Sequence, residues 1–405
     1  NIMEENEFLL SLQQMVDIIE DFRKKLNVGL AKDKTELACI PTFVHPTTEV
    51  KGEALVLDLG GTNYRVAIVN FDGEKPVIRP ENGWKRNLAV MKTPGFTREN
   101  LFKEMADPIL ETKRDKVMPI GYCFSYPADS TLDGDATLAR WTKGVNINEM
   151  VGQPVGKPLV DYLNQKADPQ FSNIRVINDT VASLFAGLTF YGYDAYIGLI
   201  VGTGTNMATL IPVNKIPKLS YVKELNPEAL IPVNLESGNF FPPHLVACDD
   251  KVDQLSDKPG TQRFEKAISG MYLGEILKAA FSATKFEEPF DAQKLTSIMN
   301  YPDMYKEEYV KVARSIYERS AALVAAQIAG LVLELKAQTP SIKKIMLTAD
   351  GSLFWSKDNN GTNYKDLVVK NLQRVFNEYH VDDIHVDINS MDNANLIGTA
   401  IAALS

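Results

Sequence analysis

The chain has 405 residues, of which 45% are hydrophobic and 23% charged, the composition of a folded protein. Because this length exceeds what one ordinary hydrophobic core covers, we expect two domains. The 43 basic and 52 acidic residues give a net charge of −9, which argues against nucleic acid or an anionic membrane surface as the main partner.

We expect neither an export signal nor a metal site built from cysteines. The first residues, NIMEENEF, are acidic where a signal peptide is basic. No apolar run approaches the roughly 20 residues of a membrane span. Cys39, Cys123 and Cys248 are far apart and fit no metal-ligand spacing, so we expect them to be buried and reduced. These features predict a cytoplasmic protein.

Apolar residues recur every three to four positions from Phe8 to Leu26, which predicts an amphipathic helix. Further apolar runs predict strands, and long segments with helical spacing follow them. The expected strands are 54–59, 64–70, 117–124, 174–177, 195–201, 207–211, 344–348 and 384–388. The other expected helices are 263–281, 309–338, 364–379 and 395–404. Strands mixed with helices indicate an α/β protein.

Two similar glycine-rich hairpins are expected. The first two strands enclose Gly60-Gly61-Thr62-Asn63, and residues 196–211, YIGLIVGTGTNMATLI, repeat this plan. Glycines let backbone N–H groups converge on an anion, because no Cβ blocks the approach. Two such turns from two related lobes could hold one polyphosphate between them. For either hairpin alone, the alternative is a tight turn that requires a positive φ.

Two polar segments contain groups suited to phosphoryl transfer. Asn178 and Asp179 follow a predicted strand and precede a helix, at the sheet edge where α/β proteins collect ligands. A helix cap is the alternative role for Asp179 and, for that residue taken alone, the commoner one. Residues 124–146 include Ser125, Thr142 and Lys143, whose hydroxyls and ammonium group could bind a polyol and a phosphate. An ordinary solvated loop is the alternative there.

Seven segments occur in the order found in hexokinases: LDLGGTNYRV, FSYP, WTKG, VINDTVASL, VGTGTN, FEKAISGMYLGE and ADGSLF. The chain therefore resembles the hexokinase family over roughly residues 50 to 400, as a single-unit, bacterial-type hexokinase or glucokinase. The resemblance implies an α/β, two-lobed, actin-like ATPase fold of duplicated ribonuclease H-like domains with a ligand cleft between the lobes. It implies a small lobe of residues 52–175 plus 395–405 and a large lobe of residues 1–51 plus 176–394.

The resemblance also implies an ATP-dependent kinase that feeds glycolysis by phosphorylating the 6-hydroxyl of glucose, mannose or another hexose. Asp179 would be the general base, Lys143 and Arg65 would lie near the transferred phosphate, and Asp58 would hold hydrated Mg²⁺. The residues implied to contact the sugar are Ser125, Thr142, Lys143, Asn178, Asp179, Asn206, Glu236 and Glu265. Those implied to contact ATP are Gly60, Gly61, Thr62, Asn63, Gly202, Thr203, Gly204, Gly270, Gly351 and Ser352.

One departure from the family pattern affects the expected sugar pocket. After Glu236 the sequence reads Ser-Gly-Asn-Phe where family members commonly have Trp-Gly-Ala-Phe. Two other functions stay open: a kinase for a different hexose or an amino sugar, and a non-catalytic sugar-sensing protein of the same fold. The presence of both Asp179 and Lys143 favours a catalyst. We expect a monomer or weak homodimer without nucleic-acid or membrane partners.

Overall fold

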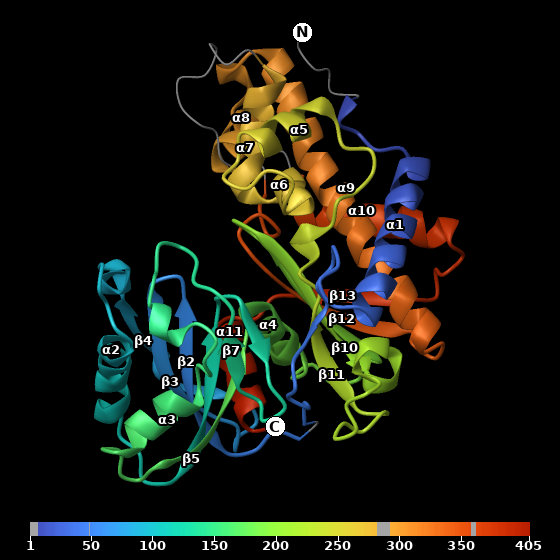
Figure 1. The fold of residues 1–405 in the computed structure, drawn as a ribbon. Coiled ribbons are helices and arrows are strands. Elements are labelled where there is room, and N and C mark those ends of the chain that lie inside the picture. The colour runs from blue at the N-terminus through green and yellow to red at the C-terminus, as the bar shows by residue number, and fades with distance from the viewer. Residues whose placement is uncertain (1–6, 48, 282–291, 358–361) are drawn as a thin grey trace.

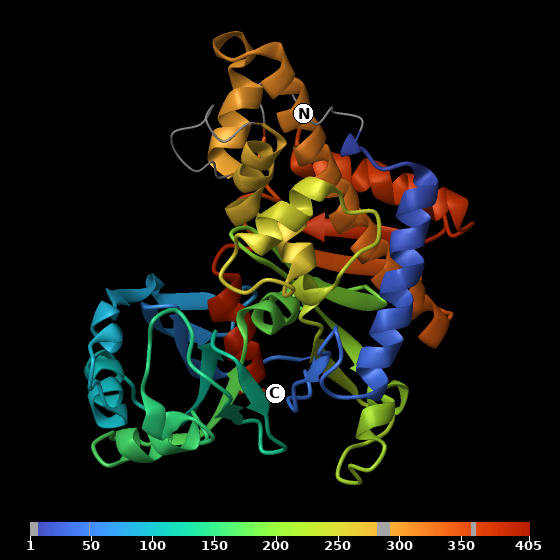
Figure 2. The same cartoon turned by 45° about the horizontal axis from the view of Figure 1, so that its top comes forward.

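Two β-sheets of similar topology form the framework of the molecule (Figure 1). A computed structural model describes residues 7–47, 49–281, 292–357 and 362–405. The sheets lie in separate lobes, and both views show helices from distant parts of the chain between them (Figure 2). The α/β class expected from the sequence is confirmed.

The first sheet contains five strands in the order β4-β3-β2-β5-β8. Their bounds are β2 (Glu53–Gly60), β3 (Asn63–Asn70), β4 (Val77–Asn87), β5 (Met118–Phe124) and β8 (Phe171–Ile177). Neighbours among β2, β3 and β4 run antiparallel, whereas β2, β5 and β8 run parallel. A short ribbon of β6 (Ala128–Ser130) and β7 (Ala136–Leu138) follows β5.

Side chains of β2 alternate between two apolar layers, as the period of a strand requires. Leu55, Leu57 and Leu59 pack in one core cluster with residues of α2 (Arg98–Glu111) and α3 (Lys157–Asn164). Ala54 and Val56 pack on the opposite face, against α11 (Ala394–Ala403). Both faces are therefore covered, which explains why this strand reads as a continuous apolar run.

The second sheet contains six strands in the order β1-β11-β10-β9-β12-β13. Their bounds are β1 (Ile40–Pro41), β9 (Ala195–Val201), β10 (Thr205–Pro212), β11 (Leu230–Asn234), β12 (Lys344–Asp350) and β13 (His385–Asn389). Neighbours among β9, β10 and β11 run antiparallel, and β9, β12 and β13 run parallel. This sheet thus repeats the first with β1 added at its edge, so the similarity expected of the two hairpins is confirmed.

Most helices belong to the lobe of the second sheet (Figure 1). Their bounds are α1 (Leu12–Ala31), α5 (Ala247–Gln254), α6 (Arg263–Ile268), α7 (Gly270–Ala280), α8 (Ala292–Asn300), α9 (Glu307–Gln338) and α10 (Tyr364–Glu378). α1 and α10 pack along α9. Between the sheets, α4 (Asp179–Gly187) crosses α11 so closely that a Cβ on Gly398 would lie 1.8 Å from the carbonyl oxygen of Ala182.

The long helix α9 corrects the expectation that no segment could span a membrane. By length and apolar composition it could do so, but 83% of its apolar window is buried inside the protein. Its all-round hydrophobicity follows from its central position, because α1, α10 and α8 surround it. It is the core helix of this lobe.

Two expected helices have different bounds. The first begins at Leu12 rather than Phe8, because the Ser11 side chain accepts a hydrogen bond from Gln14 N and the Gln14 side chain accepts one from Ser11 N. The segment 263–281 forms two helices, since Ser269 has an extended backbone and Gly270 N donates to Gly202 O at 2.7 Å. The three cysteines are buried, as expected.

Candidate active site

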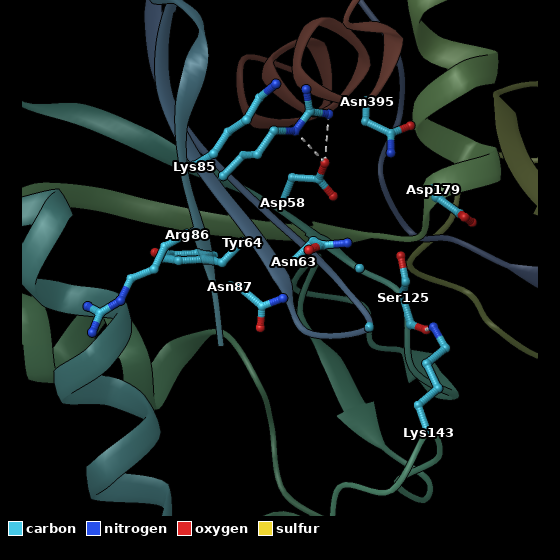
Figure 3. Close-up of a pocket in the computed structure, with 13 residues that line it drawn as sticks. Asp58, Asn63, Tyr64, Lys85, Arg86, Asn87, Ser125, Lys143, Asp179 and Asn395 are labelled. Atoms are coloured by element: carbon cyan, nitrogen blue, oxygen red, sulfur yellow. Dashed lines mark hydrogen bonds and ion pairs between the residues drawn. The ribbon is translucent and has the colours of Figure 1, made fainter. Parts of the chain in front are cut away.

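Two adjoining cavities contain most of the residues expected to bind ligands. The larger, of about 1040 Å³, is lined by Ser125, Thr142, Lys143, Asn178, Asp179, Gly202, Thr203, Gly204, Asn206, Glu236, Glu265, Gly351 and Ser352, among others. The smaller, of about 730 Å³, adds Asp58, Gly60, Gly61, Asn63 and Arg65 (Figure 3). Ser125, Lys143 and Asp179 line both. Thr62 and Gly270 line neither cavity but adjoin residues that do, since Thr62 lies between Gly61 and Asn63 and Gly270 N donates to Gly202 O.

Asp179 lies where β8 ends and α4 begins, with its side chain toward the cavities (Figure 3). The cap of α4 is Asn178, whose Oδ1 accepts a hydrogen bond from Val181 N at 2.8 Å. The cap interpretation of Asp179 is therefore wrong. Thr180 Oγ1 donates to Asp179 Oδ1 at 3.3 Å. Burial raises the pKa of Asp179 above its ordinary value, and the negative charge of Asp58 adds to the rise.

Two glutamates face the larger cavity from the second lobe. Glu236 follows β11 and has a left-handed backbone, with φ of 53°. Glu265, on α6, accepts a hydrogen bond at Oε1 from Thr205 N at 2.9 Å. Burial raises the pKa of both carboxyl groups, and each rise is increased by a neighbouring carboxylate, Asp179 for Glu236 and Glu236 for Glu265. Three acidic side chains thus converge on one cavity.

A buried amide that we did not predict from the sequence, Asn234, lies among these acids. Its Nδ2 donates to Glu236 Oε1 at 2.7 Å, and its Oδ1 accepts from Asn206 Nδ2 at 2.7 Å. The only sequence signal for it is its position at the end of a strand, two residues before Glu236. The side chain of Asn206, implied to bind sugar, reaches the cavity wall but bonds to the protein itself.

The segment 124–146 is anchored rather than loosely solvated. Tyr126 Oη donates to Gly61 O at 2.5 Å, which ties the segment to the first glycine turn. Lys143 has a φ of 59°, and its Nζ lies 3.3 Å from Ser125 O and 5.1 Å from the centre of the Tyr126 ring. The ammonium group is thereby held at the boundary of both cavities.

The first glycine turn brings opposite charges together. Asp58 on β2 and Arg65 on β3 are register partners, and Arg65 Nη2 and Nε lie 2.8 and 3.1 Å from Asp58 Oδ2 (Figure 3). Gly61 has a φ of 60°, so here the expected need for positive φ is met. Two further cationic residues of this cavity, Lys85 and Arg86, come from β4, a strand that we did not predict.

The second glycine turn differs from the expected tight turn. Neither Gly202 nor Gly204 has a positive φ. A Cβ on Gly204 would lie 2.5 Å from Glu265 Oε1, and one on Gly202 would lie 3.3 Å from the Cα of Gly351. Close approach rather than backbone angle therefore favours glycine on both sides of this turn, most strongly at Gly204. Gly351 itself has a φ of 115° and packs against Val201 O.

Comparisons with known proteins agree on one family. Family models described as hexokinase match residues 3–189 and, in two overlapping parts, 196–302 and 292–405. A hexokinase of Kluyveromyces lactis is 28% identical over an alignment of 453 residues, covering 100% of this chain and 92% of the relative. Hexokinase-7 of Oryza sativa subsp. japonica is 31% identical, covering 82% of this chain and 81% of the relative.

The fold has solved counterparts as well. The structure of a hexokinase from Schistosoma mansoni, complexed with glucose, aligns with a TM-score of 0.74 at 24% identity. The alignment covers 99% of this chain and 97% of that one. The expected two-lobed fold is confirmed. The bacterial-type attribution stays a prediction.

Proposed function

Since this chain belongs to the hexokinase family, we propose that it transfers the terminal phosphoryl group of ATP to the 6-hydroxyl of glucose. The observation that carries the proposal is the convergence of Asp179, Glu236 and Glu265 on one cavity that also contains the second glycine turn. Carboxylates accept hydrogen bonds from the hydroxyls of a polyol, and the backbone N–H groups of glycine turns donate to phosphates. Sugar and nucleotide would therefore meet beside Asp179.

The acids and amides of the larger cavity would orient the hexose. Glu236 and Glu265 each accept a hydrogen bond from the protein at Oε1, from Asn234 and Thr205 N. Their second oxygens would accept from sugar hydroxyls. Ser125, Thr142 and Asn178 line the same cavity and add hydroxyl and amide groups. Holding the hexose from several sides places its primary hydroxyl in a fixed position, which lowers the entropic part of the barrier.

Asp179 would act as the general base. Its carboxylate takes the proton of the 6-hydroxyl while that oxygen attacks the terminal phosphorus in line. Lys143 at the boundary of the cavities stabilises the charge that develops on the transferred phosphoryl group. Burial raises the pKa of Asp179, which strengthens its carboxylate as a base.

The glycine turns and the ion pair beside the first turn would receive the ATP phosphates. Among the described residues, no group of three or more His, Cys, Asp or Glu side chains could hold a metal by itself. Mg²⁺ commonly binds one carboxylate together with waters and substrate phosphates, and Asp58 fits that role. When bound, the ion neutralises charge on the phosphates. Arg65, which forms an ion pair with Asp58, would contact the phosphates directly.

A coupled assay of ADP release with glucose, mannose, fructose and glucosamine tests this function. We expect turnover with glucose and a lower kcat/KM with the amino sugar. If no sugar leads to ADP release, the result would favour the non-catalytic alternative. The presence of Asp179 and Lys143 argues against that alternative. Cytoplasmic location and a monomer or weak homodimer remain predictions, and analytical ultracentrifugation tests the second.

A further inference from the structure

The amide of Asn234 links two residues of the hexose cavity from a buried position. Asn234 is the last residue of β11, and 6% of its surface is exposed. Its Nδ2 donates to Glu236 Oε1 at 2.7 Å. Its Oδ1 accepts hydrogen bonds from Asn206 Nδ2 at 2.7 Å and from Glu236 N at 3.3 Å. One side chain thus contacts both the carboxylate and the backbone of Glu236.

Backbone groups fix the direction of this hydrogen-bonded chain. Asn206 Oδ1 accepts from Met207 N at 2.8 Å and Ser237 N at 3.1 Å, and backbone N–H groups can only donate. The Nδ2 of Asn206 must therefore face Asn234. Asn234 in turn must present Oδ1 to Asn206 and Nδ2 to Glu236. This series of hydrogen bonds ends at Glu236, to which Asn234 Nδ2 donates. An ionised carboxylate can only accept.

Glu236 requires such a donor because of its surroundings. Its left-handed backbone begins the turn Ser237–Asn239, and its carboxylate accepts a hydrogen bond from Asn234 Nδ2. The charged groups that face it are Asp179 on α4, Glu265 on α6 and Arg140 in the segment 124–146. Two of these three are acids, so a carboxylate without a donor would be pushed toward its protonated form or another orientation.

We propose that Asn234 is a positioning residue for the hexose: it holds Glu236 so that Oε2 accepts hydrogen bonds from the sugar. The proposal rests on the proposed hexose kinase activity and adds a residue to it. Because Asn234 acts through Glu236, its loss affects sugar binding before it affects the proton transfer at Asp179. ATP binding depends on the glycine turns and should change little.

Asn234→Asp tests the proposal, because the new side chain has the same size but, when ionised, offers only acceptors. Calorimetric titration with glucose in the absence of ATP measures Kd over a series of pH values. At neutral pH we expect Kd to rise about tenfold or more, the loss of one hydrogen bond to a charged group. The rise should shrink at lower pH, because one proton shared by the two carboxylates restores a hydrogen bond.

Two further variants separate positioning from general damage. Asn234→Ser adds no charge, so Kd should rise without the added pH dependence, and this variant serves if Asn234→Asp does not fold. Asn173→Asp makes the same chemical change at an exposed site on β8, and should bind glucose as the unmodified chain does.

The possible outcomes distinguish this proposal from the function itself. If both Asn234 variants melt at lower temperature but bind glucose within twofold of the unmodified chain at every pH, the amide is only structural and the proposal is overturned. If the unmodified chain does not bind glucose, the proposed function fails, and the role of Asn234 fails with it.

Discussion

Asp179 lies where the proposed proton transfer takes place, so Asp179→Asn isolates that transfer. The amide keeps the size of the side chain but cannot accept the hydroxyl proton. We expect kcat to fall by about 10²–10⁴-fold, while ATP still binds. Since Asn178 rather than Asp179 caps α4, the substitution should not weaken the helix. Retention of more than about a tenth of the parental kcat would remove Asp179 from the mechanism.

The same variant has a stability prediction whose sign follows from the raised pKa of Asp179. A carboxyl group whose pKa is higher in the folded state stabilises the fold at pH values below its unfolded pKa. That contribution is lost as pH rises through the folded pKa. Neutral pH is well above the unfolded pKa of an Asp, so at least part of that contribution has been lost there, and Asp179→Asn should match or exceed the parental Tm. A clearly lower Tm at neutral pH would contradict the proposed environment.

The two glycines of the second turn give a paired prediction, because each adjoins a different ligand region. Gly204→Ala places a Cβ 2.5 Å from Glu265 Oε1 and must displace that carboxylate. We expect the KM for glucose to rise about tenfold. Gly202→Ala instead presses on Gly351 and should raise the KM for ATP. Steady-state kinetics with each substrate varied in turn checks both. If both variants raised the same KM equally, the turn would not separate the glucose site from the ATP site.

At the scale of elements, α4 and α11 cross between the two sheets and pack closely at Gly398. Ala normally stabilises a helix by about 1 kcal/mol relative to Gly. At Gly398, however, a Cβ would lie 1.8 Å from Ala182 O, so Gly398→Ala must separate the helices. We expect a net loss of about 1–3 kcal/mol in the free energy of unfolding, as in overpacked cores.

Urea denaturation measures this loss, with Gly73→Ala as the matched control. A Cβ on Gly73 would lie 3.9 Å from its nearest neighbour, Lys75 O, an ordinary contact. The control should change stability by no more than about 0.5 kcal/mol. A Gly398→Ala chain as stable as the control would mean that the crossing relaxes without cost.

An element can be predicted from the sequence when its burial imposes a regular pattern of apolar residues. α9 was predicted because nearly every residue between Val310 and Leu335 is buried, and most of these buried residues are apolar. β4 was not, because VIRPENGWKRN has no buried residue and therefore no alternation to detect. The break at Ser269 was also missed, since the contact of Gly270 N with Gly202 O joins segments far apart in the chain.

The same difference explains which residues of the candidate site could be predicted from the sequence. Asp179, Lys143 and Glu265 stand in recognisable motifs, and the structure brings them to one cavity. Asn234 has no motif, and its role depends on the pairing of β10 with β11, where Ala208 is its register partner. Local sequence cannot specify which strands become neighbours, so such a residue becomes visible only in the folded chain.

At the scale of the whole molecule, we expect the lobes to close on the hexose. The larger cavity takes Ser125, Thr142 and Lys143 from one lobe and Glu236 and Glu265 from the other. A sugar that bonds to both sides stabilises the closed arrangement, which excludes water from the phosphoryl transfer. Small-angle scattering should show a smaller radius of gyration with glucose than without it. An identical radius at saturating glucose would argue against closure.

The position of α11 near the end of the chain has a consequence for biosynthesis. Leu396 and Ala400 cover the face of the first sheet that contains Ala54, Val56 and Val69. A ribosome completes that sheet at β8 and then makes every strand of the second sheet except β1 before α11 emerges. The nascent chain therefore carries an uncovered apolar sheet face while the residues from α4 to β13 are made, which exposes it to aggregation and to chaperones. The first lobe finishes folding only after the last helix has left the ribosome.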